Sequence, residues 1–125
     1  ALRQAVAEAR RRWPELVPAA LCADLPALRP EELAAALASV VPGGPSFMPD
    51  ADGLGTTLYT APYDEFDPHF GLDSRRAHQV SGALELRDDL ASVRRDVDDL
   101  TDLRAAAALG LGPETGALVA RLHLA

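Results

Sequence analysis

The chain has 125 residues, a formal net charge of −7 and 48% hydrophobic residues, and this length suits one domain with a real core. The negative charge argues against nucleic-acid binding, which needs clustered positive charge. No apolar run reaches the ~20 residues that a membrane span requires. All twelve basic residues are arginine, which excludes a P-loop lysine and a lysine Schiff base within these residues.

The chain's single cysteine, Cys22, cannot form an internal disulfide, so a reduced, cytoplasmic setting is expected. The sequence begins at Ala1 without a methionine and inside a stretch with helical spacing. We therefore expect the chain to be a portion of a longer protein.

The first elements alternate between helix and strand. Helical spacing of apolar residues covers Ala1 to Trp13, and the apolar run Leu16–Cys22 predicts a buried strand. Pro30, followed by two glutamates, begins a second helix. Strand, loop and helix in this order are typical of an α/β fold with a mostly parallel sheet and covering helices.

The rest of the chain continues with shorter elements. Strands are predicted at 46–48 and 57–60, extended segments at 83–86 and 91–97, and helices at 74–80, 101–109 and 113–122. Residues 62–74 are rich in proline, aspartate and aromatics without a clean period, so this segment is predicted to be irregular.

Asp24 lies just beyond the carboxyl end of the predicted strand Leu16–Cys22. In open α/β sheets this edge is where ligands bind, and a carboxylate there commonly holds a hydrated divalent cation. The alternative is that Asp24 only belongs to a turn before Pro26.

A second group of acids lies in the segment 93–99, which reads VRRDVDD. On an extended segment, Asp96 and Asp98 share one face, where two carboxylates repel each other unless a cation intervenes. This pattern predicts a metal site. The alternative is that these acids cap the helix that begins near Thr101, and for Asp99 capping is the preferred interpretation.

Two glycine-containing segments could bind an anion. In the loop Gly53–Thr57, the glycines let backbone N–H groups approach an anion and the hydroxyls of Thr56 and Thr57 can donate to it. Gly71 precedes Ser74, the predicted cap of a helix, where free N–H groups favour negative charge. An ordinary turn and an ordinary helix cap are the alternatives.

Four segments in this order and at these spacings resemble the guanylyltransferases of coenzyme F-420 biosynthesis, and the likeness covers essentially the whole chain. The segments read LCADLPAL, DGLGTT, HFGLDSRRAH and RRDVDDLTDL. The sequence departs from the family pattern at Ala23, where glycine is usual, at Leu54, and at Asp99 and Leu100.

The resemblance implies a function, a fold and site residues. This family transfers GMP from GTP to phosphoenolpyruvate or 2-phospho-L-lactate with release of pyrophosphate, on a Rossmann-like three-layer α/β/α nucleotidyltransferase fold like that of the molybdenum-cofactor guanylyltransferases. It implies Mg²⁺, or else Mn²⁺, as the cofactor and GTP as co-substrate. The implied metal ligands are Asp24, Asp96 and Asp98, and the implied acceptor-binding residues are Thr56, Gly71 and Ser74.

Nothing in the sequence corresponds to the lysine-bearing nucleotide-binding loop with which this family begins. We therefore expect residues 1–125 to be the C-terminal metal- and acceptor-binding portion of a single nucleotidyltransferase domain. The N-terminal GTP-binding portion would be absent or held in a separate chain, and we expect no turnover from this chain alone. Two alternatives remain: a nucleotidyltransferase with another phosphorylated acceptor, and a non-catalytic α/β interaction module.

Overall fold

A four-stranded mixed sheet with helices around it forms the centre of the computed structural model, which describes residues 1–125. The strands are β1 (Ala19–Leu21), β2 (Ser46–Pro49), β3 (Thr56–Thr60) and β4 (Leu84–Glu85). The helices are α1 (Leu2–Arg12), α2 (Pro30–Ala38), α3 (Ser74–Ser81), α4 (Ala91–Arg94), α5 (Leu100–Leu109) and α6 (Pro113–Leu122), with one 3₁₀ turn, η1 (Tyr63–Glu65).

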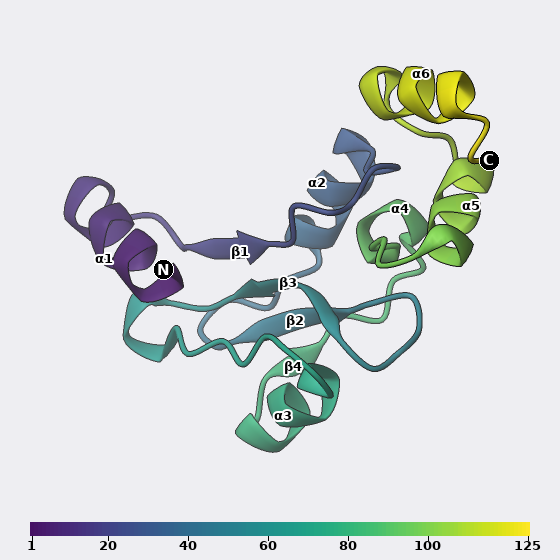
Figure 1. The fold of residues 1–125 in the computed structure, drawn as a ribbon. Helices are drawn as coiled ribbons and strands as arrows, with labels where there is room; N and C mark the ends of the chain where they lie inside the picture. The colour runs from purple at the N-terminus through teal and green to yellow at the C-terminus, as the bar shows by residue number, and fades with distance from the viewer.

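The strands lie in the order β1-β3-β2-β4 (Figure 1). β3 pairs antiparallel with both β1 and β2, whereas β2 and β4 pair parallel. The predicted α/β class is therefore confirmed, but the described strands do not form a mostly parallel sheet. The reason is the direct connection of β2 to β3 by a short loop, because only antiparallel neighbours can be joined in this way.

The predicted strand Leu16–Cys22 is shorter and more exposed than the sequence suggested. β1 covers only Ala19–Leu21 and lies at the edge of the sheet, where two of its three residues are exposed. Pro18 cannot donate a backbone hydrogen bond, which keeps it out of the ladder, although its carbonyl accepts from Thr60 Oγ1 at 2.8 Å. The expectation of a buried strand was therefore wrong.

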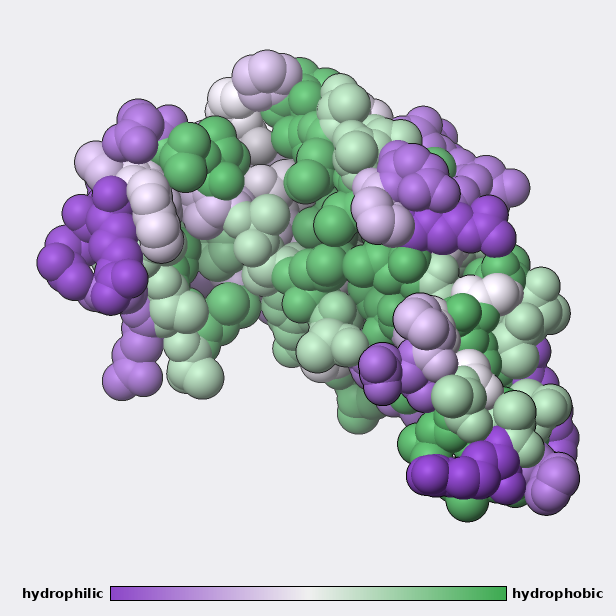
Figure 2. Space-filling model, turned by 90° about the horizontal axis from the view of Figure 1, so that it is seen from above, coloured by the Kyte–Doolittle hydropathy of each residue, from purple (hydrophilic) through white to green (hydrophobic).

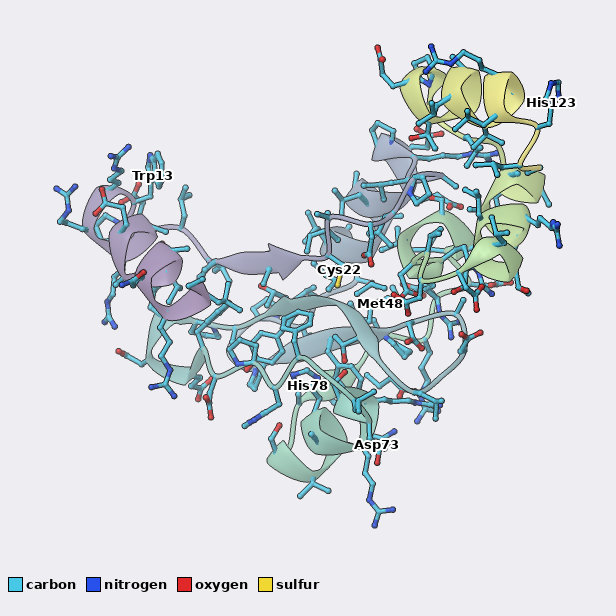
Figure 3. All side chains as sticks on the ribbon, viewed as in Figure 1. Trp13, Cys22, Met48, Asp73, His78 and His123 are labelled. Carbon is cyan, nitrogen blue, oxygen red and sulfur yellow. The ribbon has the colours of Figure 1, made fainter.

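Two apolar clusters cover the two faces of the sheet. Because successive strand residues point to opposite faces, Met48 and Leu58 pack with residues of α2 and α4, whereas Phe47 and Tyr59 pack on the other face, beside α3. Figure 3 shows Met48 and His78, the latter a residue of α3, on opposite sides of the sheet. Both clusters lie next to the loops that carry the predicted site residues.

Residues 91–97 do not form an extended strand, contrary to the prediction from the sequence. Ala91–Arg94 form α4, a single turn that buries Ser92 and Val93. Ser92 N–H donates to Glu32 Oε1 at 3.0 Å, and its hydroxyl accepts from the backbone N–H of Arg29 at 3.0 Å. These contacts with α2 fix a helical turn, so Asp96 and Asp98 lie in the loop that follows it and not on a strand.

Apolar residues gather on the face seen from above, between hydrophilic ends (Figure 2). A groove on the molecule is lined partly by Val17, Leu37 and Val41, all of which are exposed. None of the helices combines the length and apolar character that crossing a bilayer demands.

Candidate functional site

Three carboxylates converge beside the exposed edge strand. Asp24 follows β1, and Asp96 and Asp98 lie between α4 and α5. One carboxylate oxygen of each lies within 4.8 Å of those of the other two. The backbone N–H of Val97 donates to the Asp24 carbonyl at 3.2 Å and joins the two segments. The structure thus brings together the three predicted ligands, whose role in binding a metal stays a prediction.

The first turn of α5 holds the loop that carries Asp96 and Asp98. Asp99 is the N-cap of α5 and accepts from the backbone N–H of Asp102 at 2.9 Å, which confirms the capping interpretation. Asp102 in turn accepts from the backbone N–H of Asp98 at 3.0 Å and from Arg95 Nη1 at 3.3 Å. The loop is therefore fixed by backbone and side-chain bonds that leave the carboxylate of Asp98 free.

No ion pair in the structure involves Asp24, Asp96 or Asp98. Burial raises the pKa of Asp96 to about 6, and the negative charges of Asp50, Asp98 and Asp24 add to this effect. Carboxylate oxygens without basic partners are the hard ligands that Mg²⁺ prefers. The donor set therefore fits a hydrated divalent cation.

The raised pKa of Asp96 predicts how this group affects stability. Between its ordinary value of 3.8 and about 6, the folded state binds more protons than the unfolded state, so stability is lost as the pH rises through this window. In a buffer with chelator, we expect Asp96→Asn to raise the free energy of unfolding at pH 7. The shift sets a limit of about 3 kcal/mol, and solvent screening of this partly exposed group reduces the expected gain to about 1 kcal/mol.

Urea unfolding of Asp96→Asn and the unaltered chain at pH 7 and at pH 4 measures this effect. The difference should be much smaller at pH 4, where Asp96 is protonated in the folded state and its buried charge is gone. An equal gain at both pH values would show that the charge of Asp96 is not its cause.

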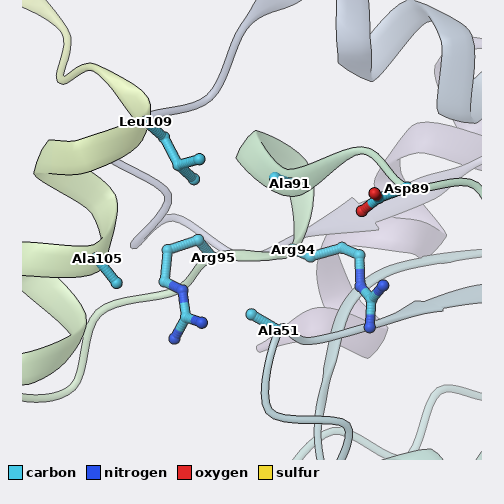
Figure 4. Close-up of a pocket in the computed structure, with 7 residues that line it drawn as sticks. All are labelled: Ala51, Asp89, Ala91, Arg94, Arg95, Ala105 and Leu109. Carbon is cyan, nitrogen blue, oxygen red and sulfur yellow. The ribbon is translucent and has the colours of Figure 1, made fainter.

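Two arginines, Arg94 and Arg95, directly precede Asp96 in the chain, and Figure 4 shows both of them beside a pocket. Arg94 donates to the carbonyls of Pro49 and Asp50 at 3.2 and 3.1 Å, and Arg95 pairs with Asp102 and Asp52. Both side chains line a pocket between α4 and α5. They stabilise the surrounding loops and do not neutralise the three carboxylates.

Two of the predicted anion-binding residues are in contact, because the first residue of β3 lies beside the first residue of α3. Thr56 and Ser74 are both buried, and Ser74 Oγ lies 2.9 Å from Thr56 Oγ1. Gly71 lies in the exposed turn before α3, where its φ of +130° suits glycine and its carbonyl accepts from Ser74 N–H at 3.3 Å. Asp73, not Ser74, is the N-cap residue, so the predicted capping by Ser74 was wrong.

The carboxylates and the hydroxyl pair are connected across β1 and β3. Cys22, two residues before Asp24, donates its backbone N–H to Thr57 O at 2.9 Å and its thiol to Thr56 O at 3.4 Å. Asp50 raises the pKa of Asp96 and also accepts from Gly55 N–H at 2.9 Å. The three carboxylates and the hydroxyl pair therefore belong to neighbouring parts of the structure, linked through Cys22 and Asp50.

Two residues of this region, Asp50 and His78, were not among the site residues predicted from the sequence. Asp50 binds the backbone N–H groups of Leu54 and Gly55, an arrangement that the polar DADG segment could have suggested as a turn stabilised by its own side chain. His78 is fully buried against Thr56. Its spacing of four residues from Ser74, which places both on one face of α3, was the available signal.

Gly55 has no room for a side chain, because a Cβ there would overlap Asp50 Oδ2. We expect Gly55→Ala to break the bonds between Asp50 and the loop and to lower the free energy of unfolding by about 2 kcal/mol. Gly44→Ala is the matched control, since its Cβ would meet open space. Urea unfolding of both variants measures this; equal stabilities would mean that the contact with Asp50 contributes nothing.

Sequence identity to curated proteins shows the family of the chain. No protein-family model matches it. It is 55% identical over 127 residues to the phosphoenolpyruvate guanylyltransferase of Streptomyces coelicolor, with 100% of the chain and 60% of that protein covered. The proteins of the same name from Streptomyces avermitilis and Thermomonospora curvata are 53% and 52% identical, with 98% of the chain and 57% and 54% of their lengths covered. The chain therefore belongs to the phosphoenolpyruvate guanylyltransferase family, and it spans little more than half the length of these curated relatives.

Proposed function

We propose that this chain is the metal- and acceptor-binding portion of an enzyme that transfers GMP from GTP to phosphoenolpyruvate. The observation that carries the proposal is the convergence of Asp24, Asp96 and Asp98 without a basic partner. The relatives named for this reaction, at 50–55% identity, support the choice of substrates.

The proposed reaction joins two polyanions. An oxygen of the acceptor phosphate attacks the α-phosphorus of GTP, the bond between the α-phosphorus and the bridging oxygen to the β-phosphorus breaks, and pyrophosphate leaves with the electron pair. The attacking phosphate is ionised at neutral pH, so no side-chain nucleophile or general base is required. Neutralisation of charge and positioning then account for most of the catalysis.

The residues of this chain would supply these two effects. Asp24, Asp96 and Asp98 would hold Mg²⁺, or Mn²⁺, which when bound neutralises phosphate charge. The hydroxyl pair of Thr56 and Ser74 would donate a hydrogen bond to the acceptor, and the exposed turn at Gly71 would let the acceptor approach α3. The protein groups thus fix the acceptor, and no covalent bond to the protein forms.

We further infer that the sheet is part of a three-layer α/β/α nucleotidyltransferase fold. The remaining portion, which would bind GTP, then lies outside residues 1–125. Cytoplasmic coenzyme F-420 biosynthesis is the setting implied by the resemblance of the four sequence segments. The proposal therefore requires a second protein portion for turnover.

The test joins the chain to the portion of the Streptomyces coelicolor relative that it does not cover. With GTP, Mg²⁺ and phosphoenolpyruvate, the joined protein should release pyrophosphate and form the guanylated acceptor, whereas the chain alone should do neither. If the joined protein prefers 2-phospho-L-lactate, that compound and not phosphoenolpyruvate is its acceptor. A folded joined protein that is inactive with both acceptors would contradict the proposed function.

A further inference from the structure

Thr56, Ser74 and His78 form a buried hydrogen-bonded group where β3 meets α3. Their exposed fractions are 7%, 1% and 0%. Thr56 Oγ1 lies 2.9 Å from both Ser74 Oγ and His78 Nδ1. His78 therefore contacts Thr56, the same hydroxyl that pairs with Ser74.

The backbone determines which nitrogen of His78 carries the proton. His69 N–H donates to His78 Nε2 at 2.8 Å, so Nε2 must present a lone pair. Burial lowers the pKa of His78, and the nearby His69 lowers it further, while a backbone contact with Ser74 acts in the opposite direction. The neutral ring therefore carries its proton on Nδ1 and donates it to Thr56 Oγ1.

The ring of His78 is also held in this orientation by its aromatic neighbours. Tyr59 stacks on it with ring centroids 5.0 Å apart, and Phe47 and Phe70 lie at 5.2 and 6.0 Å. A ring flip would place a carbon atom at the position of each nitrogen and break both hydrogen bonds. The packing therefore preserves Nδ1–H as the group that faces Thr56.

Because Nδ1 of His78 is a donor, the hydroxyl pair of Thr56 and Ser74 has one proton more than its contacts within the protein use. The two hydroxyls of Thr56 and Ser74 have two protons, and the contact between them uses one. His78 accepts neither of them, because its Nδ1 is a donor. The structure shows no other acceptor for either hydroxyl. One hydroxyl proton is thus left over, and a buried donor of this kind requires an acceptor.

We propose that His78 is a positioning residue, which orients the Thr56–Ser74 pair so that one hydroxyl proton is kept for an oxygen of a bound phosphate or carboxylate. The identity of that ligand as phosphoenolpyruvate rests on the proposed function. The opposite tautomer would turn Nδ1 into an acceptor and consume the spare proton within the protein. His78 thus controls donation to the ligand without contacting it.

The first measurement determines the tautomer directly. A long-range proton–nitrogen correlation spectrum of the ¹⁵N-labelled chain identifies the protonated ring nitrogen, and His78→Phe assigns the signal against His69 and His123. We expect the Nδ1–H tautomer at neutral pH. The Nε2–H tautomer, or an averaged mixture of both, would overturn the proposal without involving any ligand.

The second measurement tests donation to the ligand. His78→Phe keeps the aromatic packing but removes the donor, whereas His78→Asn can place an amide N–H near the position of Nδ1–H. In calorimetry with phosphoenolpyruvate and Mg²⁺, we expect His78→Phe to weaken binding at least about tenfold and His78→Asn by less than about threefold. Circular dichroism establishes that both variants are folded. Equal affinity of His78→Phe and the unaltered chain would overturn the proposal.

Inorganic phosphate, used as a second probe, separates this inference from the proposed function. If the unaltered chain binds phosphate in a manner that depends on His78 but does not bind phosphoenolpyruvate, the proposed substrate fails and this inference stands. If phosphoenolpyruvate binds equally well with and without His78, this inference fails and the proposed function stands. Failure of the unaltered chain to bind either ligand overturns both.

Discussion

Asp98→Asn is expected to lower GMP transfer by the joined protein roughly 10³-fold, because the loss of one of three ligands removes several kcal/mol of charge stabilisation. The backbone of Asp98 is held by Asp102, so the substitution leaves the loop in place. The rate of GMP transfer is measured as pyrophosphate release over a range of Mg²⁺ concentrations. If the loss of activity comes from a lost metal ligand, the variant should need a higher Mg²⁺ concentration than the unaltered protein.

Asp99→Asn is the matched control for this experiment. It removes the same charge from the neighbouring residue, but Asp99 caps α5 and lies outside the three-carboxylate group. Asparagine is an equally good cap, so we expect activity within about threefold of the unaltered protein. Equal losses in the two variants would point to net charge and contradict the assignment of Asp98 as a ligand.

Met48→Ala is expected to lower the free energy of unfolding by about 2–5 kcal/mol, the range for a large-to-small change in a well-packed core. Met48 is fully buried and packs with Leu58, Leu86 and Val93 on the α4 side of the sheet. Urea unfolding measures the loss. Leu72→Ala, at a fully exposed position, should change stability by less than about 0.5 kcal/mol.

Local signals in the sequence predicted several elements well. Pro30 begins α2, Gly110 follows the last residue of α5, and Asp99 caps α5 as expected. In each case one residue type meets a local backbone requirement. Proline has the fixed φ that suits the first position of a helix, glycine accepts the positive φ of Gly110, and aspartate accepts a hydrogen bond from a free N–H group of the first turn. Such requirements act within a few residues, and a sequence shows them directly.

Long-range contacts account for the elements that could not be predicted. Residues 91–97 contain valines that favour an extended segment, yet hydrogen bonds of Ser92 to α2 select a helical turn. Strand alternation was therefore the wrong reason to place Asp96 and Asp98 together, although the loop brings them together nonetheless. The partnership of His78 with Thr56 depends on the docking of α3 against β3, which no local pattern reveals.

The hydrogen bond from Val97 N–H to the Asp24 carbonyl joins the first third of the chain to the last. Neither segment contains all three carboxylates, so the group exists only while the two segments are docked against each other. The Val97 amide is accordingly a hydrogen-exchange probe for the opening of this junction. A ligand that bridges the carboxylates would slow that exchange and would hold the two distant parts of the chain together.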